Sequence, residues 1–227
     1  RVSSQPIQTY TMTLPGSNLD ESKYARIVSD HYGTVHHELP INNPSLALLD
    51  DFSKFIDEPI ADSSILPSYM VFGAASKNVS VVLGGDGGDE IFGGYNDYIT
   101  SIADARRLRF VPKHLLEACA KLASHLKDGV SGRNRIYSLR DGAYKQMVWG
   151  TPYFNSVSRQ RLLSSEVFGE LRPLLDAPER FLSELFEEGD DPVDCMLRTH
   201  FGSIMPDDFL VKVDRSSMAH SLEVRTP

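Results

Sequence analysis

The residues of this chain that are best suited to carry out chemistry lie in an acidic, glycine-rich stretch. Residues 81–95 read V-V-L-G-G-D-G-G-D-E-I-F-G-G-Y, which places Asp86 and Asp89 three positions apart. Two carboxylates at this spacing can face one hard metal ion or one set of amine donors. Mg²⁺ usually takes one or two protein carboxylates and completes its shell with phosphate oxygens and water. Glycines let the backbone approach a ligand closely, so the stretch predicts a cation site beside a bound ligand.

A dinucleotide-binding fingerprint is the first alternative for this stretch. After Gly85 and Gly87, the third glycine of a G-x-G-x-x-G pattern would fall at position 90, which is Glu90. Acidic side chains would also repel a bare pyrophosphate unless a cation lay between them. For Glu90 we expect only the favourable interaction of a negative charge with a helix N-terminus. The prediction of a ligand-binding role therefore concerns Asp86 and Asp89.

The elements around the acidic stretch follow the alternation of an open α/β sheet. Side-chain periodicity and turn residues predict these segments: strand 7–14, helix 20–33, strand 34–39, helix 44–56, helix 63–77 and strand 79–83. The continuous apolar run of the last strand is typical of a strand buried on both faces. Ligands of such sheets bind at the carboxyl ends of the strands, where the acidic stretch begins.

The second half of the chain changes to a helical pattern. The expected helices are 113–127, 158–167, 178–187, 192–204 and 208–221, and residues 128–135 have the composition of an exposed loop. We expect a single domain over residues 1–227, with a sheet-bearing part at 1–100 and a mainly helical part at 101–227. The predicted fold class is α/β, with an open, mostly parallel sheet flanked by helices and a helical C-terminal half.

Composition excludes several classes of partner. The 227 residues include 23 Lys and Arg against 31 Asp and Glu, a net charge of −8 that argues against a nucleic-acid-binding surface. No apolar run approaches the roughly 20 residues that span a bilayer, so no membrane segment is expected. Cys119 and Cys195 are too few for a disulfide scaffold or a four-ligand zinc site, and they favour a reducing, cytoplasmic location.

Residues 83–95 resemble the S-G-E/D-G-S/G-D-E-x-F-G-G-Y signature of the synthetase domain of glutamine-dependent asparagine synthetases. Further segments match the same family: Y-T-M-T-L at 10–14, G-T-V-H-H-E at 33–38, D-E-P-I-A-D-S-S at 57–64, P-D-D-F-L-V-K-V-D-R at 206–215 and L-E-V-R at 222–225. The resemblance implies an adenylating ligase of the PP-loop ATP pyrophosphatase type, with an adenine nucleotide alpha hydrolase-like fold.

The resemblance also implies a reaction and its participants. In this family ATP activates the side-chain carboxylate of aspartate as an acyl-adenylate, and ammonia derived from glutamine displaces AMP. The implied cofactors are ATP and Mg²⁺, since Mg²⁺ neutralises the departing pyrophosphate. The implied partners are aspartate and a glutaminase domain that this chain lacks, with no nucleic acid and no membrane, and a homodimer stays open.

Individual roles follow from positions within the matched motifs. Asp89 matches the Mg²⁺ ligand, and Asp86 matches an acidic residue that handles the incoming amine and its protons. Gly84 and Gly85 match backbone positions near adenosine, and Met12 matches an apolar residue beside the adenine. The remaining implied residues are Lys212, with a catalytic role, and Asp62, Ser63, Asp214 and Arg225, with roles in substrate binding. Capping of the following helix is the alternative role for Asp62 and Ser63.

Two departures from the family pattern shape the functional expectation. The S-G-G-x-D-S loop, which cradles pyrophosphate in the family, is not found in residues 1–227. A catalytic lysine of the family is expected beyond Pro227, outside this sequence. We therefore expect part of a synthetase domain, cut from a longer enzyme and inactive alone. Two alternatives remain: an acceptor carboxylate other than that of aspartate, as in polysaccharide biosynthesis or β-lactam and lasso-peptide closure, and a non-catalytic relative. Retention of both aspartates argues against the latter.

Overall fold

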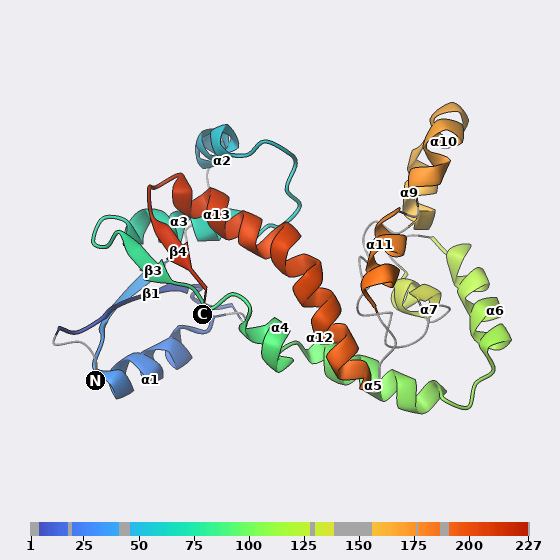
Figure 1. The fold of residues 1–227 in the computed structure, drawn as a ribbon, viewed down its shortest axis with the longest axis horizontal. Helices are drawn as coiled ribbons and strands as arrows, with labels where there is room; N and C mark the ends of the chain where they lie inside the picture. Colours follow the sequence, from blue (N-terminus) through green and yellow to red (C-terminus); the bar gives the residue numbers. More distant parts are fainter. Residues whose placement is uncertain are drawn as a thin grey trace. The chain divides into compact units, whose positions relative to one another are not determined.

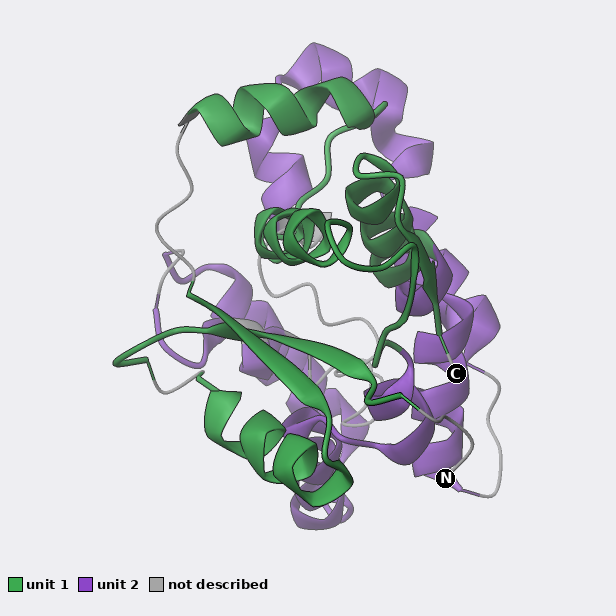
Figure 2. Ribbon diagram, turned by 90° about the vertical axis from the view of Figure 1, so that its left-hand side faces the viewer, with its two compact units in different colours: residues 1–86, 207–227 green, residues 87–206 purple. Residues whose placement is uncertain are grey.

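The computed structural model describes residues 5–17, 20–40, 46–127, 130–138, 156–175, 177–186 and 191–226. The chain divides into two compact units (Figure 2). Unit 1 combines residues 1–86 with residues 207–227, and unit 2 comprises residues 87–206. The expected α/β class with parallel strands is confirmed, while the assignment of residues 1–227 to a single domain stays a prediction.

Unit 1 begins with a strand–helix–strand unit (Figure 1). Strand β1 (Gln8–Thr13) pairs in parallel with β2 (Val35–Pro40), and helix α1 (Ser22–Tyr32) connects them. Before α1, the Asp20 carboxylate accepts a hydrogen bond from the backbone of its first residue at 3.0 Å, and this bond lowers the Asp20 pKa. Gly33 ends α1 with a φ of 63°, a left-handed conformation that favours glycine. All three predicted elements are confirmed.

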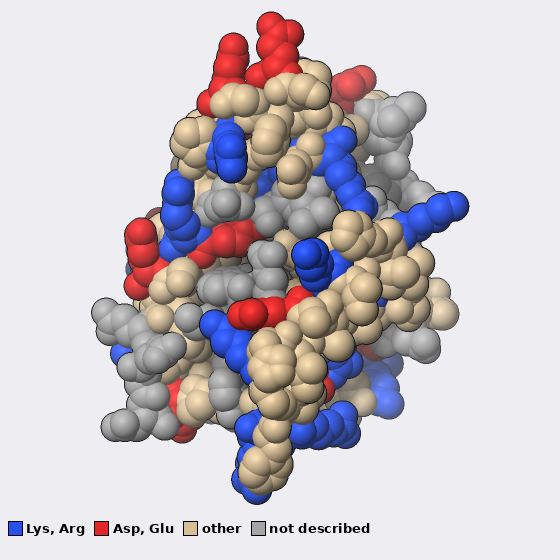
Figure 3. Space-filling model, turned by 90° about the vertical axis from the view of Figure 1, so that its right-hand side faces the viewer, with Lys and Arg blue, Asp and Glu red and all other residues tan. Residues whose placement is uncertain are grey.

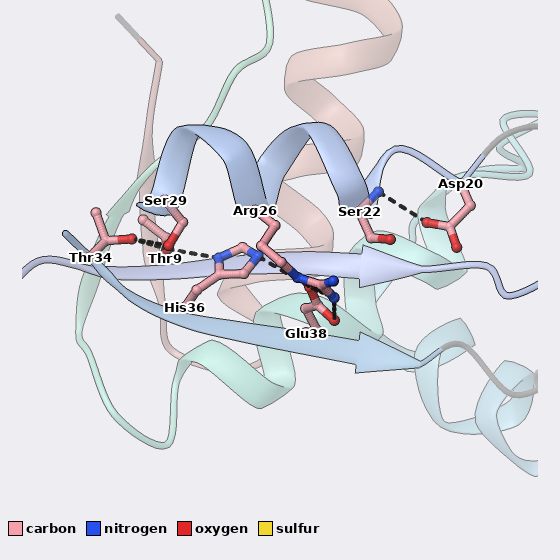
Figure 4. A network of polar contacts seen from close by, with 8 residues as sticks. All are labelled: Thr9, Asp20, Ser22, Arg26, Ser29, Thr34, His36 and Glu38. Carbon is pink, nitrogen blue, oxygen red and sulfur yellow. Dashed lines mark hydrogen bonds and ion pairs between the residues drawn. The ribbon is translucent and has the colours of Figure 1, made fainter. Parts of the chain in front are cut away.

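Polar side chains beneath α1 join it to both strands (Figure 4). The hydroxyl groups of Ser29 and Thr34 lie 2.7 Å apart, and that of Thr9 on β1 lies 2.9 Å from Thr34. The same Thr9 hydroxyl lies 2.9 Å from Nδ1 of His36 on β2. The three hydroxyl groups and His36 Nδ1 each gain a hydrogen-bond partner, which offsets the cost of removing them from water, whereas His36 Nε2 is buried without a hydrogen-bond partner among the described residues.

A second parallel pair forms from β3 (Val81–Leu83) and β4 (Glu223–Arg225), so the described strands make two separate pairs. The prediction that residues 79–83 are buried on both faces is wrong. Val81 is 47% exposed and Leu83 is 76% exposed, because side chains two apart share a face and no described element covers this one. Strand β4 was not predicted, since three residues are too few for a detectable periodicity.

Besides α1, the described helices of unit 1 are α2 (Leu46–Phe52) with the 3₁₀ turn η1 (Ser53–Phe55), α3 (Ile65–Ala75) and α13 (Leu210–Met218). The residues after α13 pack on α3 through Gly73, where a Cβ atom would come within 2.8 Å of the His220 ring. The His220 ring also lies 4.2 Å from that of Tyr69, which contacts the fully buried Phe52. These contacts hold α3 and α13 together.

Unit 2 is helical among its described residues. Its elements are α4 (Gly88–Phe92), α5 (Asn96–Leu108), α6 (Lys113–Ser124), α7 (Arg133–Ser138), α9 (Ser156–Leu162), α10 (Ser165–Leu171), the 3₁₀ turn η3 (Arg172–Leu174), α11 (Ala177–Leu185) and α12 (Pro192–Gly202). A π-helical turn, η4 (Met205–Phe209), leads along the chain from unit 2 into unit 1. The buried cluster of unit 2 is formed by Tyr98, Phe186, Cys195 and Met196.

Two predictions for this helical half need correction. The expected helix 158–167 is split into α9 and α10, because the Ser164 hydroxyl accepts a hydrogen bond from Val167 and starts a new helix there. The loop expected at 128–135 becomes helical from Arg133. The expected helix start at residue 44 and helix end at residue 187 lie outside the described residues.

The surface carries charges of both signs. On the face shown in Figure 3, Lys and Arg side chains are interspersed with Asp and Glu side chains. Within the part of the chain that the structure describes, none of the helices has the length and apolar character needed to cross a membrane.

Candidate active site

The acidic stretch starts at the carboxyl end of β3. Gly84 extends the pairing of β3 with β4, because its N–H donates to the carbonyl oxygen of Arg225 at 2.8 Å. The half-buried Asp86 side chain folds back over Gly84, where a Cβ atom would lie 3.0 Å from Asp86 Oδ2. A Cβ atom built at Gly85 would meet no other atom within 4 Å. Strand pairing therefore fixes the start of the turn at Gly84, and there is open space beside the backbone of Gly85.

Helix α4 presents Asp89. Gly87 precedes α4 with a φ of 96°, a conformation that L side chains rarely adopt, and Asp89 lies exposed in the first turn. A Cβ atom at Gly94 would overlap the Asp89 carboxylate, so that carboxylate occupies space that only a glycine leaves free. Asp89 also anchors the end of α4, since its carbonyl oxygen accepts from Gly93 and Gly94. Gly94 is thus a determinant of the Asp89 orientation.

Glu90 has a different environment from its neighbour Asp89. It is only 2% exposed, and the Tyr95 hydroxyl donates a hydrogen bond to its Oε1 atom. Burial, this hydrogen bond and the Glu90 charge raise the Tyr95 pKa. Burial and the charges of Glu90 and Asp89 raise the pKa of Tyr98 to about 12, and its hydroxyl lies 2.8 Å from His200 Nδ1. Glu90 is therefore part of a buried network, beyond the helix-terminus effect expected for it.

A second cluster, within unit 1, is centred on Lys212 of α13. Lys212 is 8% exposed, and its Nζ atom donates to Asp62 Oδ2 at 2.9 Å and to Ser64 Oγ at 3.0 Å. The same Nζ lies 4.6 Å from the centroid of the Phe209 ring. An ammonium group has three N–H donors, and Asp62 and Ser64 accept from two of them. The structure thus brings together two of the predicted residues, Lys212 and Asp62.

Asp62 also organises the turn before α3. Its Oδ1 atom accepts from the Ser64 backbone N–H at 2.8 Å and from the Ser64 hydroxyl at 2.7 Å. Burial acts to raise the Asp62 pKa, but the hydrogen bonds from Ser64 and Lys212 outweigh it and the pKa is lowered. Asp208 lies one helical turn before Lys212, and burial followed by the Asp62 charge raises its pKa. Asp62 is therefore the carboxylate that pairs with the ammonium.

The other predicted residues of unit 1 are more dispersed. Met12 is half-buried on β1 opposite Leu39. Arg225 is exposed at the end of β4, with its Nε atom 2.7 Å from Glu223 Oε1. Ser63 and Asp214 are exposed and lie outside the Lys212 cluster. Sequence reasoning missed Ser64 and Phe209 as neighbours of Lys212, although both lie in motifs that had been recognised.

The acidic stretch fits the donor chemistry of a magnesium site. In the described residues, no group of three His, Cys, Asp or Glu side chains is arranged to hold a metal ion. Mg²⁺ needs fewer protein ligands than that when a phosphate compound supplies the rest. The Asp89 side chain is exposed, which leaves its carboxylate oxygens accessible to a cation.

Comparison with known proteins gives consistent matches. The family model described as Asparagine synthase matches residues 1–227. The chain is 30% identical over 218 residues to “Putative asparagine synthetase (glutamine-hydrolyzing) 2” of Methanocaldococcus jannaschii, a match that covers 93% of this chain. It is 27% identical over 171 residues, or 75% of its length, to “Asparagine synthetase (glutamine-hydrolyzing) 1” of Bacillus subtilis. The chain spans 40% and 26% of these two proteins. No solved structure matches it.

Proposed function

Because this chain belongs to the asparagine synthase family, we propose that it forms the ATP-dependent synthetase part of a glutamine-hydrolysing asparagine synthetase. In the proposed reaction, a side-chain carboxylate oxygen of aspartate attacks the α-phosphorus of the substrate ATP, and pyrophosphate leaves as the α–β phosphoanhydride bond breaks. Ammonia then attacks the acyl carbon, the amide forms, and AMP leaves. The adenylation is needed because a free carboxylate is a poor electrophile.

The observation that carries this proposal is the acidic turn directly after β3. Asp86 follows the strand end, Asp89 follows in the first turn of α4, and the backbone at Gly85 has open space beside it. Asp89 would hold Mg²⁺, which when bound neutralises charge on the departing pyrophosphate. Gly84 and Gly85 would let the nucleotide approach the backbone closely, and Met12 would supply an apolar contact to the adenine.

Asp86 is the proposed catalytic residue. Attack by ammonia leaves a proton on the new nitrogen, and that proton must be removed before the amide is complete. A half-buried carboxylate beside the reacting carbon can accept it as a general base. The exposed residues Ser63, Asp214 and Arg225 are proposed to contact substrate.

The test is aspartate-dependent exchange of labelled pyrophosphate into ATP, measured on the full-length protein. We expect exchange in the wild type, and in Asp89→Asn a loss on the order of a hundredfold or more at fixed Mg²⁺. Asp86→Asn should retain exchange but lose asparagine formation, because it acts on the incoming amine. The exposed Asp97→Asn, on α5, is the matched control and should match the wild type.

The outcomes separate the alternatives. Exchange that requires another carboxylic acid in place of aspartate would contradict the proposed acceptor and retain adenylation. Absence of exchange with every acid tested would contradict the ligase itself. For the 227-residue chain alone, we propose no measurable pyrophosphate release, since the pyrophosphate-cradling motif is not found in it.

A further inference from the structure

The segment of residues 57–64 is tied to α13 at two points. This segment connects η1 to α3 without helix or strand structure. Near its start, Asp57 Oδ2 lies 2.5 Å from Arg215 Nη2, and near its end, Asp62 Oδ2 lies 2.9 Å from Lys212 Nζ. Lys212 and Arg215 are three residues apart on α13, so they project from the same side of the helix. One helix face therefore holds both ends of the segment.

The two ties differ in strength. Exposed fractions are 11% and 16% for the side chains of Lys212 and Asp62, but 43% and 75% for those of Arg215 and Asp57. Exposed ion pairs contribute little to the stability of a fold, because water and salt screen the attraction between their charges. A buried pair is screened far less, and removing one partner leaves an uncompensated buried charge. The Lys212–Asp62 pair is thus the main tie.

Helix α13 provides a rigid support for this tie. The His220 ring after α13 covers Gly73 of α3 at a distance that leaves no room for a Cβ atom. Tyr69 of α3 packs between His220 and the buried Phe52. Since α3 begins at the end of segment 57–64, both partners of the Lys212–Asp62 pair stand on packed elements.

We propose that Lys212 is a positioning residue that holds segment 57–64 in the conformation that binds the acceptor carboxylate substrate. The inference rests on the proposed function, because that function supplies the acceptor. Lys212 acts through Asp62 and the turn at Ser64, because its ammonium donates hydrogen bonds to both residues and also lies over the Phe209 ring. The exposed Ser63 is the residue that the ordered turn presents to the acceptor.

Three variants of the full-length protein separate positioning from general stability. Lys212→Met removes the ammonium, and Asp62→Asn removes the carboxylate that pairs with that buried ammonium. The double variant removes both charges, so it should recover much of the thermal stability lost in Asp62→Asn. It cannot restore the tie between α13 and the segment. Lys54→Met, which breaks an exposed ion pair with Asp51, is the matched control.

The first measurement is amide hydrogen exchange of residues 57–64. In Lys212→Met and in the double variant, we expect exchange to speed up on the order of tenfold or more, with α1 and α12 unchanged. The Lys54→Met control should exchange at wild-type rates. Wild-type protection of the segment in the double variant would overturn the inference, whether or not the protein is active.

The second measurement is kinetic. In the double variant, we expect the KM for the acceptor to rise on the order of tenfold to a hundredfold, while the KM for ATP stays the same. Lys212→Arg, which keeps the charge, should recover part of this loss. An inactive wild type would contradict the proposed function. The amide hydrogen exchange of residues 57–64 would then still decide whether the Lys212–Asp62 pair holds the segment. An active wild type with an unchanged acceptor KM in the double variant would overturn the inference alone.

Discussion

At the scale of single residues, Asp89 shows how a glycine can set the orientation of a charged neighbour. The Asp89 carboxylate lies where a Cβ atom of residue 94 would be, and its backbone carbonyl accepts from Gly94. Any other residue at position 94 must move the carboxylate or the backbone. The motif glycine is therefore part of the arrangement that presents the proposed magnesium ligand.

This gives a prediction for Gly94→Ala. We expect the Mg²⁺ concentration for half-maximal pyrophosphate exchange to rise on the order of tenfold, as is common when a residue that orients a metal ligand is changed. Gly169→Ala, on α10, is the control, because its added Cβ atom would meet nothing within 4 Å. An unchanged Mg²⁺ requirement in Gly94→Ala would show that the carboxylate does not depend on this glycine.

Residue types and short spacings were predictable from the sequence, whereas pairings across the chain were not. Asp86 and Asp89 were identified because both lie in one short motif. The Lys212–Asp62 pair joins residues 150 positions apart, so only the folded chain reveals it. Likewise, the contact of the Ser64 hydroxyl with Lys212 was not predicted, because it depends on the turn before α3, which places this hydroxyl beside Lys212 and Asp62.

At the scale of elements, the packing of α3 against the residues after α13 predicts a dependence of stability on pH. Burial of the His220 ring lowers its pKa below 6.5, and its Nε2 atom has no hydrogen-bond partner among the described residues. The folded state thus favours neutral imidazole. In the unfolded chain the ring gains its proton more readily, so stability is lost as the pH falls through 6.5 and towards the lowered pKa.

The measurement is thermal unfolding of wild type and His220→Phe between pH 8 and pH 5. We expect the Tm of the wild type to fall further than that of the variant between pH 8 and pH 5, because phenylalanine cannot titrate. All other titrating groups are common to the two proteins, so the difference isolates His220. Parallel pH profiles would contradict the account of this packing contact.

Elements with strong local signals were predicted well. The strands at 8–13 and 35–40 and the helices α1, α3 and α12 follow from periodicity and from turn residues such as Gly33. The exposure of β3 was missed, because an apolar run indicates burial only if other elements cover it. The short β4 has too few residues for a pattern, and its existence depends on pairing with β3.

At the scale of the whole molecule, the acidic stretch falls where the chain passes from one compact unit to the other. Asp86 is the last residue of the first part of unit 1, and Asp89 belongs to unit 2. The division was not predictable, because unit 1 is completed by residues 207–227, which follow 120 residues of unit 2. The α/β class was predictable, since it depends on local alternation.

The relatives named above are longer than this chain. The chain spans 40% and 26% of these two polypeptides. The proposed tests of function use the full-length protein, whereas the pairing of Lys212 with Asp62 and the packing of His220 concern unit 1 by itself.

Isotope transfer gives the sharpest test of the proposed activation of the acceptor carboxylate by adenylation. Aspartate labelled with oxygen-18 in its side-chain carboxylate is supplied to the full-length protein with ATP, Mg²⁺ and ammonia, and the products are analysed by mass spectrometry. We expect the label to appear in AMP as asparagine forms. Label in inorganic phosphate or pyrophosphate, with unlabelled AMP, would contradict it.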